Sequence, residues 1–415
     1  MRRTPGHFRF NSLGDFSGIG FGLFLILSAS IVRGQWLTVT HIWWNVDFEF
    51  PTEFTRRSAL MHKELIPDTV VIIDADVYKG RLFVTTPSLM PGTPATLSTV
   101  DQFTSVAPLL RPFPDWSWHN VTDRNDCSYI KSVFRIKIDK LGRLWVVDSG
   151  VTNAFSDRTI RGNCNPKIMV FDLNDEDRLI RMHVIDKILI DDDSLLLNIA
   201  VQVMNEDGEN TFAYIADSMG TRLIVYDYAK DRVFIHQHPY FFPDPAYGFY
   251  KTNGVQYTVM DGLFTLAIDE KRDLLYFHAL SSGHESRVKA SILRNETITE
   301  RQAREFEAFP KRPFHASSEV ITDRGLLVFP SLEHNELLGW DTTLPYETGY
   351  FHLLARDEEA LQFPTGMKLA GDLFLMVTTR LQNLLANGMA NKGEINYRIL
   401  VGDARYLDKF LYKKR

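Results

Sequence analysis

The sequence predicts an all-β protein, and more specifically a six-bladed β-propeller. Short runs of β-branched and aromatic residues, each ending in a small or acidic turn, occur six times along the 415-residue chain. Apolar residues alternate within these runs, as in strands that are half-buried between stacked sheets. No apolar period of 3.6 residues persists long enough for a helical core. This recurrence is typical of a ring of small sheets.

Each of the six runs predicts one blade, because the runs are spaced by about the length of one four-stranded sheet with long connections. In order, they are residues 82–87 (LFVTTP), 144–150 (LWVVDSG), 212–218 (FAYIADS), 274–281 (LLYFHALS), 326–331 (LLVFPS) and 373–380 (LFLMVTTR). The strands nearest the central channel are expected at residues 70–73, 133–138, 198–203, 263–268, 317–321 and 365–369.

The first 34 residues differ from the rest of the chain. Three arginines precede an uncharged stretch at residues 16–32, and Ser30 and Gly34 offer small residues for cleavage. We therefore expect a secretory signal peptide at residues 1–34 and a secreted, extracellular protein. A membrane anchor is the weaker alternative, because the uncharged stretch is short for a spanning helix. The strand signal then continues unbroken, so residues 35–415 are expected to form one propeller domain with a short C-terminal tail.

Charge and motif content exclude several classes of function. The formal net charge of −6 becomes −9 when residues 1–34, with four arginines and one aspartate, are removed. An acidic surface argues against nucleic acid as a partner, and no stable membrane association is expected after signal cleavage. The chain has no HExxH, CxxC or GxSxG motif. We therefore expect no metal site and no cofactor.

The cysteines and two sequons agree with a secretory route. Cys127 and Cys164 are the two cysteines of the chain, and an even count in a secreted protein predicts a disulfide. Two buried free thiols are the alternative. Asn120 and Asn295 begin Asn-x-Thr sequons and are expected to be glycosylated.

Motifs along most of the chain resemble one family. They include 81–87 (RLFVTTP) with 92–97 (GTPATL), 112–116 (PFPDW), 143–150 (RLWVVDSG), 164–168 (CNPKI), 215–217 (IAD), 223–227 (LIVYD), 242–245 (FPDP), and 363–364 with 367–368. In this order they resemble the Yellow and major royal jelly proteins of insects. The resemblance implies a secreted six-bladed propeller, with the two cysteines at the family's disulfide. It also implies several functions on one fold: pigmentation, dopachrome conversion, amine binding and nutrition.

One departure from the family pattern lies near the expected channel. The family usually carries Phe-Pro-x-Asp-Met-Lys, whereas this chain reads Phe-Pro-Thr-Gly-Met-Lys at residues 363–368. Gly366 thus replaces a carboxylate, and ligand preference is expected to differ from that of the family's other members.

Candidate site residues come from the ends of the inner strands and from one aromatic stretch. Asp261, His315 and Glu319 are ionisable groups near those ends, and they are the candidate catalytic residues. The stretch at residues 238–250 is the densest aromatic run and contains three prolines. Within it, Tyr247 and Tyr250 are the candidate ligand contacts, together with Asp261 and Glu319. The alternatives are turn-capping or surface roles for the ionisable groups and an apolar plug for the aromatic stretch.

Three functions fit these candidates. The first is a pigmentation-pathway protein that converts dopachrome or a related catechol derivative, for which one positioned base suffices. The second is a binder of catechol or indole amines such as dopamine or serotonin, held by aromatic faces and a carboxylate. The third is an extracellular structural or interaction factor, which would present an exposed apolar patch.

Overall fold

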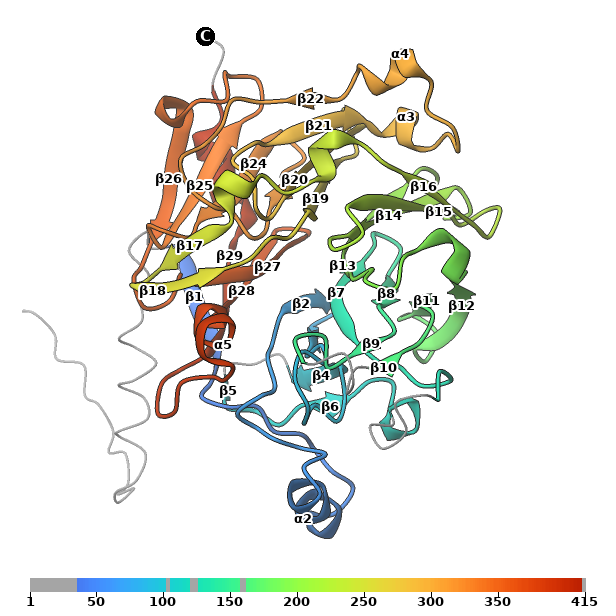
Figure 1. The fold of residues 1–415 in the computed structure, drawn as a ribbon, viewed down its shortest axis with the longest axis vertical. Coiled ribbons are helices and arrows are strands. Elements are labelled where there is room, and N and C mark those ends of the chain that lie inside the picture. The colour runs from blue at the N-terminus through green and yellow to red at the C-terminus, as the bar shows by residue number, and fades with distance from the viewer. Residues whose placement is uncertain (1–35, 102–104, 120–125, 157–161, 413–415) are drawn as a thin grey trace, which may run out of the picture.

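The structure confirms the six-bladed β-propeller. It is a computed structural model that describes residues 36–101, 105–119, 126–156 and 162–412. Figure 1 shows the innermost strands arranged around one axis, with the remaining strands of each sheet stepping outward. The expected signal peptide at residues 1–34 and the Asn120 sequon lie outside the described residues.

Each of the six runs found in the sequence forms the second strand of one sheet. From the axis outward, the sheets contain β2 (Asp74–Tyr78), β3 (Arg81–Thr85), β4 (Leu97–Asp101) and β6 (Arg111–Pro112); β7 (Val133–Ile138), β8 (Arg143–Asp148), β11 (Lys167–Asp172) and β12 (Arg178–Val184); β13 (Leu196–Val203), β14 (Thr211–Asp217), β15 (Arg222–Asp227) and β16 (Arg232–His236); β19 (Leu263–Asp269), β20 (Leu274–Ala279), β21 (Ser286–Lys289) and β22 (Glu307–Ala308); β23 (Val320–Ile321), β24 (Leu326–Ser331), β25 (Glu336–Asp341) and β26 (Phe351–Arg356); and β27 (Phe363–Ala370), β28 (Leu373–Thr379), β29 (Tyr397–Asp403), β1 (Leu37–Trp43) and β5 (Ser105–Val106). We number these blades 1 to 6 in this order.

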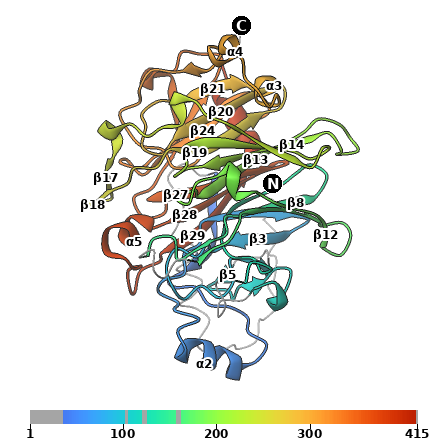
Figure 2. The same ribbon diagram turned by 45° about the vertical axis from the view of Figure 1, so that its right-hand side comes forward.

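Helices and hairpins decorate the ring. The α-helices are α2 (Glu53–Met61), α3 (Ala290–Leu293), α4 (Glu300–Ala303) and α5 (Leu381–Asn387), and the short 3₁₀ helices are η1 (Trp116–Trp118), η3 (Lys187–Leu189), η4 (Pro239–Phe241), η5 (Pro245–Tyr247), η6 (Thr348–Tyr350) and η7 (Ala404–Phe410). Two hairpins, β9 (Val151–Thr152) with β10 (Gly162–Asn163) and β17 (Phe249–Thr252) with β18 (Val255–Thr258), lie outside the blades. The β17–β18 hairpin packs against α5 on one side of the ring (Figure 2). No described helix has the length and hydropathy needed to cross a bilayer.

The two ends of the described chain close the ring. β1 pairs antiparallel with β29 over the register Leu37 to Gly402 and Trp43 to Tyr397. Sheet 6 is therefore completed by a strand from the beginning of the sequence, which removes the open edges that a linear array of sheets would leave.

The acidic turns that end two of the runs hold the inner strands in place. The Asp148 carboxylate, at the end of β8, accepts hydrogen bonds from the backbone N–H groups of Lys131 and Ser132, just before β7. Asp217, at the end of β14, accepts one from the N–H of Leu195, just before β13. Because these buried N–H groups have no strand partner, the carboxylates satisfy them and fix where each inner strand begins.

Inner strands of neighbouring blades are also joined directly. Asp74 and Asp76 lie on one face of β2, and their carboxylates accept hydrogen bonds from the N–H groups of Ile136 and Ile138 on β7, at 3.1 and 2.8 Å. The apolar core fills the space between adjacent sheets, where for example Val147 of blade 2 packs in one cluster with Ile215 of blade 3.

Arg135 of β7 fills the centre of the ring. Its guanidinium donates hydrogen bonds to the backbone oxygens of Leu197, Ser317 and Thr365, at 3.2, 3.3 and 2.7 Å. It also lies over the ring of Phe264, 4.7 Å from the centroid. These partners belong to blades 3, 5, 6 and 4, so one side chain touches four of the other five blades. Burial lowers the pKa of Arg135 to about 10, although the nearby Asp74 opposes this shift.

The predicted disulfide is confirmed. Cys127 and Cys164 are bonded, with 5.5 Å between their Cα atoms. Asn295 is exposed beyond α3, where its side-chain amide donates to the backbone oxygen of Ser291. Its glycosylation stays a prediction.

We expect Arg135→Met to lower the free energy of unfolding by about 3–5 kcal/mol, because it leaves three buried carbonyl groups without their donor. Lys137→Met is the matched control, since Lys137 lies on the same face of β7 and makes no hydrogen bond or ion pair with the described residues. Urea unfolding of both variants measures the difference. Equal stabilities for Arg135→Met and the unmodified protein would show that the central guanidinium is dispensable.

Candidate active site

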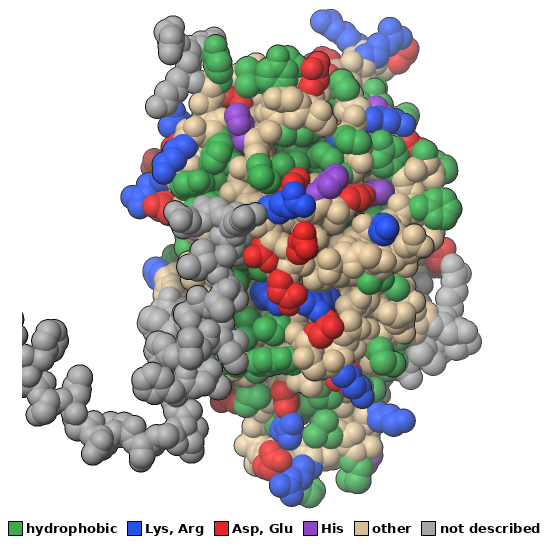
Figure 3. Space-filling view, turned by 90° about the vertical axis from the view of Figure 1, so that its left-hand side faces the viewer, with side chains coloured by type: hydrophobic (Ala, Val, Ile, Leu, Met, Phe, Trp, Pro, Cys, Tyr) green, Lys and Arg blue, Asp and Glu red, His purple; other side chains and the backbone are tan. Residues whose placement is uncertain are grey.

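The channel has two different ends, separated by Arg135. The end at which the inner strands begin is covered by the β17–β18 hairpin and α5, and it carries an aromatic and ionisable cluster. Figure 3 views the molecule from this side and shows acidic, basic and histidine side chains close together near the middle of the face. The end at which the inner strands finish opens into a cavity.

Tyr250 is the centre of the cluster at the first end. It is 3% exposed, and its hydroxyl lies 2.9 Å from the Ser281 hydroxyl. Its ring stacks on Tyr257, with 5.1 Å between centroids, and lies 3.9 Å from the His315 ring. Burial raises the pKa of Tyr250, and the negative charge of Asp261 raises it further. The phenol therefore stays neutral near pH 7.

His315 is held by groups on both of its ring nitrogens. Nδ1 is paired with the Glu333 carboxylate, which also accepts from the backbone N–H of His315 at 2.9 Å. Nε2 lies 2.9 Å from the backbone oxygen of Tyr247. Contacts on both nitrogens therefore fix the orientation of the ring. Glu333 was not among the residues singled out from the sequence; its position two residues after an expected strand is the one signal that marks it.

Asp261 offers an unpaired carboxylate beside this cluster. Its backbone N–H donates to the Ser281 hydroxyl, which also bonds Tyr250, and thereby fixes its position. Among the described residues, no group donates a hydrogen bond to its carboxylate, and burial raises its pKa to about 6. A carboxylate that titrates near neutral pH is well suited to accept a proton from a substrate.

Glu319 lies elsewhere, in a fully buried charged cluster between blades 4 and 5. His278 Nδ1 is 2.8 Å from Glu285 Oε2 and 3.3 Å from Glu319 Oε2. Arg312 Nη1 lies 3.5 Å from the same Glu285 oxygen. Burial and the Arg312 charge lower the pKa of His278, but the two carboxylates outweigh them and raise it to about 9.

This buried cluster has the spacing of a metal site but a balanced charge without one. The ligand atoms of His278, Glu285 and Glu319 lie within 4.8 Å of one another. Protonated His278 and Arg312 together offset the two carboxylates, and Arg312 would repel a divalent cation at this position. We assign the cluster a role in joining the two blades.

The unusual glycine of the 363–368 motif has a structural cause. A Cβ at Gly366 would lie 2.1 Å from Asp74 Oδ1. Asp74 is fully buried and pairs with Lys368 at 2.7 Å. Burial raises the pKa of Asp74, whereas Lys368 lowers it. The Asp74 carboxylate of β2 thus occupies the space that a side chain at position 366 of β27 would need.

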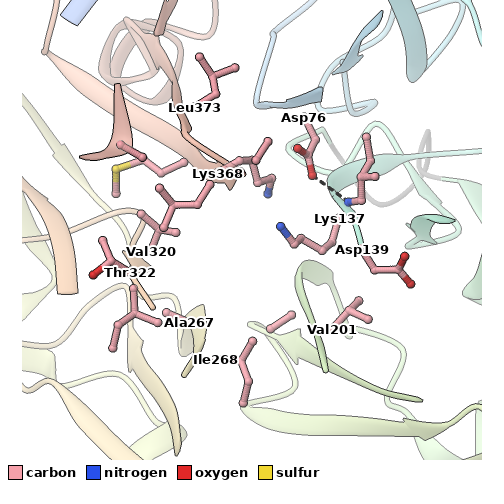
Figure 4. A pocket seen from close by; sticks show the side chains of 18 of the residues that line it. Asp76, Lys137, Asp139, Val201, Ala267, Ile268, Val320, Thr322, Lys368 and Leu373 are labelled. Atoms are coloured by element: carbon pink, nitrogen blue, oxygen red, sulfur yellow. Dashed lines mark hydrogen bonds between the residues drawn. The ribbon is translucent and has the colours of Figure 1, made fainter. Parts of the chain in front are cut away.

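The cavity at the other end has a volume of about 1070 Å³. It is lined by the second halves of the inner strands, by the turns that follow them and by residues of η7. Figure 4 shows the side chains of Lys137 and Lys368 directed into it from two blades, with Asp76 bonded to the backbone of β7. Of the five catalytic and ligand-contact residues predicted from the sequence, Glu319 is the one that lines this cavity.

The structure therefore brings Tyr247, Tyr250, Asp261 and His315 together around one end of the channel and leaves Glu319 apart. The grouping agrees with the idea of a site at the beginnings of the inner strands. Catalytic and ligand-binding roles for all of these residues stay predictions.

We expect Gly366→Asp to lower the free energy of unfolding by about 1–3 kcal/mol, because the new side chain meets Asp74. The double variant Asp74→Gly/Gly366→Asp moves the carboxylate from β2 to β27 and should recover part of this loss. Urea unfolding of Gly366→Asp, Asp74→Gly and the double variant measures the coupling between the two positions. Gly349→Asp is the control, since a Cβ there meets nothing within 4 Å. Additive effects of the two changes would contradict the exchange of carboxylates.

Comparisons with known proteins agree with the motifs. The family model described as "Major royal jelly protein" matches residues 131–409. The dopaminechrome tautomerase of Drosophila melanogaster is 30% identical over 383 residues, which are 88% of this chain and 81% of that protein. Protein yellow of Drosophila erecta is 31% identical over 363 residues, 84% of this chain and 66% of that protein. A solved luciferin-regenerating enzyme aligns with a TM-score of 0.47 and 11% identity over 80% of this chain and 91% of that one, which carries no functional argument. The chain thus belongs to the major royal jelly protein family, together with the Yellow proteins.

Proposed function

We propose that this protein is a secreted pigmentation-pathway enzyme that tautomerises an aminochrome, the cyclised and oxidised form of a catechol amine. The observation that carries the proposal is Asp261, an unpaired carboxylate with a pKa of about 6 beside an aromatic cluster. The similarity to a protein named dopaminechrome tautomerase supports the substrate class. Secretion is supported by the resemblance of residues 1–34 to a signal peptide and by the disulfide.

The proposed reaction is an internal proton transfer. The Asp261 carboxylate removes a proton from the ring carbon next to the iminium, that C–H bond breaks, and its electrons flow into the quinone ring. One quinone oxygen takes up a proton. Loss of a second proton from the neighbouring saturated ring carbon, with protonation of the other quinone oxygen, completes the dihydroxyindole, so two C–H bonds are exchanged for two O–H bonds without an external oxidant or reductant. A positioned base of this kind contributes roughly 10²- to 10⁴-fold in rate. Tyr250 and Tyr257 supply aromatic faces next to the base, and the His315 ring lies against Tyr250.

We expect Asp261→Asn to lower kcat/KM for dopachrome or dopaminechrome by about 10²- to 10⁴-fold, as loss of a general base does. In the unmodified protein, kcat/KM should fall as the pH drops through about 6, because the base becomes protonated. The decay of aminochrome absorbance, corrected for the spontaneous reaction, measures both. Asp192→Asn, at an exposed aspartate, is the control and should retain the activity. Unmodified protein that leaves the spontaneous rate unchanged would refute the enzyme proposal.

A second candidate function is the binding of biogenic amines at the same cluster. It is favoured by the carboxylates of Asp261 and Glu333, which lie close enough to Tyr250 to raise its pKa beside the stacked Tyr257. A protonated amine would be attracted to the carboxylates while its ring stacks on the tyrosines.

We expect dopamine and serotonin to bind with micromolar affinity if the cluster is an amine site. Asp261→Asn should lower that affinity by about tenfold or more. Isothermal titration calorimetry measures the affinity. Heats that equal dilution at tens of micromolar protein would exclude amine binding and leave the enzyme proposal to its own test.

A further inference from the structure

The cavity at the far end of the channel is lined by acidic and basic residues, and one of its lysines has no ion-pair partner among the described residues. Most of its charged lining residues have partners. These pairs are Asp139 with Arg143, Asp269 with Arg272, Lys140 with Glu270, Asp323 with Lys271, Arg324 with Asp408, Lys368 with Asp74, and Arg405 with Asp372. Lys79 donates to the side-chain oxygen of Asn174, at 2.7 Å.

Lys137 is the exception. It makes no hydrogen bond or ion pair with the described residues, and Figure 4 shows its amine pointing into the open cavity. The nearest acidic lining residue on the neighbouring inner strand, Asp76, directs its two carboxylate oxygens to the backbone N–H groups of Val77 and Ile138. Arg135 lies two residues before Lys137 on the same face of β7 and adds a second positive charge at the floor of the cavity.

Apolar side chains from blades 3, 4 and 5 form part of the wall around these cations, among them Val201, Ala267, Ile268 and Val320 (Figure 4). Met367 and Leu369 of blade 6 also line the cavity. A volume of about 1070 Å³ is in the range that accommodates a drug-sized molecule. An unpaired amine beside apolar side chains matches a molecule with one negative charge and an apolar body.

We propose that this cavity is a second ligand site, and that it binds a small carboxylic acid with an aromatic or aliphatic body through an ion pair with Lys137. The carboxylate lies against the Lys137 amine, with the Arg135 charge behind it, and the apolar body packs on the wall formed by blades 3 to 6. The site is distinct from the Asp261 cluster, because Arg135 fills the axis between them.

A matched pair of probes tests the charge requirement. Indole-3-acetate and indole-3-acetamide have almost the same shape, but only the first carries a carboxylate. Isothermal titration calorimetry at low salt should show that the acid binds at least tenfold more tightly than the amide. It should also show that added salt weakens the binding of the acid.

Two variants assign that binding to the cavity. Lys137→Gln should weaken the acid at least tenfold and leave the thermal midpoint of unfolding unchanged, since the amine has no partner to lose. Lys140→Gln, at the rim and paired with Glu270, should keep the affinity within about twofold. Asp261→Asn should leave binding unchanged, which separates this site from the proposed active site. Equal affinities for acid and amide, unaltered affinity in Lys137→Gln, or no saturable binding of benzoate, hexanoate and indole-3-acetate at millimolar concentrations would each overturn the proposal.

Discussion

The contacts of Arg135 with the backbone of other blades are the interaction on which the centre of this propeller depends. A propeller packs its sheets face to face, so each blade meets its two neighbours, and nothing in that packing links opposite blades. Arg135 provides this link through three carbonyl oxygens and one aromatic ring. A planar guanidinium with five donors suits the task, because carbonyl groups converge on the axis from several directions. The cost is a buried charge, which the nearby Asp74 carboxylate helps to balance.

The same side chain decides what the channel can do. Since Arg135 fills the axis, the channel is two separate spaces rather than a tunnel. One is covered by an aromatic hairpin and contains the unpaired Asp261 carboxylate, and the other is open and contains the unpaired Lys137 amine. Two spaces with different unpaired groups on one scaffold suit different ligands, which agrees with the many functions that a single fold can host.

The fold was predictable because a propeller repeats one simple pattern. Second strands such as β8 and β14 are buried on both faces, and their sequences are apolar β-branched runs. Each run ends in an aspartate that bonds the backbone just before the inner strand of the same blade. The inner strands were harder. β2 begins at Asp74, whereas the sequence predicted an inner strand at residues 70–73. Asp74 and Asp76 bond the backbone of β7, but two aspartates in the sequence are typical of a turn and not of a strand. A search for apolar runs does not detect an inner strand that carries charged side chains.

The candidate site was predictable only in part, for geometric reasons. Tyr247, Tyr250, Asp261 and His315 meet because they flank the start of two neighbouring inner strands. Glu319 belongs to the same extended segment as His315, but four residues of extended chain span about 13 Å, so the two side chains reach different places. Glu333 carried no motif. The alternation of Arg135 and Lys137 in β7 was a usable signal, since it places two cations on the channel face of one strand.

The pairing of β1 with β29 has a consequence for biosynthesis. β1 cannot pair with β29 until Gly402 has been synthesised, so nearly the whole polypeptide has to leave the ribosome before sheet 6 is complete. During that interval the nascent chain presents unpaired strand edges, the surfaces on which aggregation starts and which chaperones shield. Such distant pairing also slows folding relative to proteins with local contacts. A truncated product that ends before β29 would therefore stay exposed to quality control, however well its first five blades had formed.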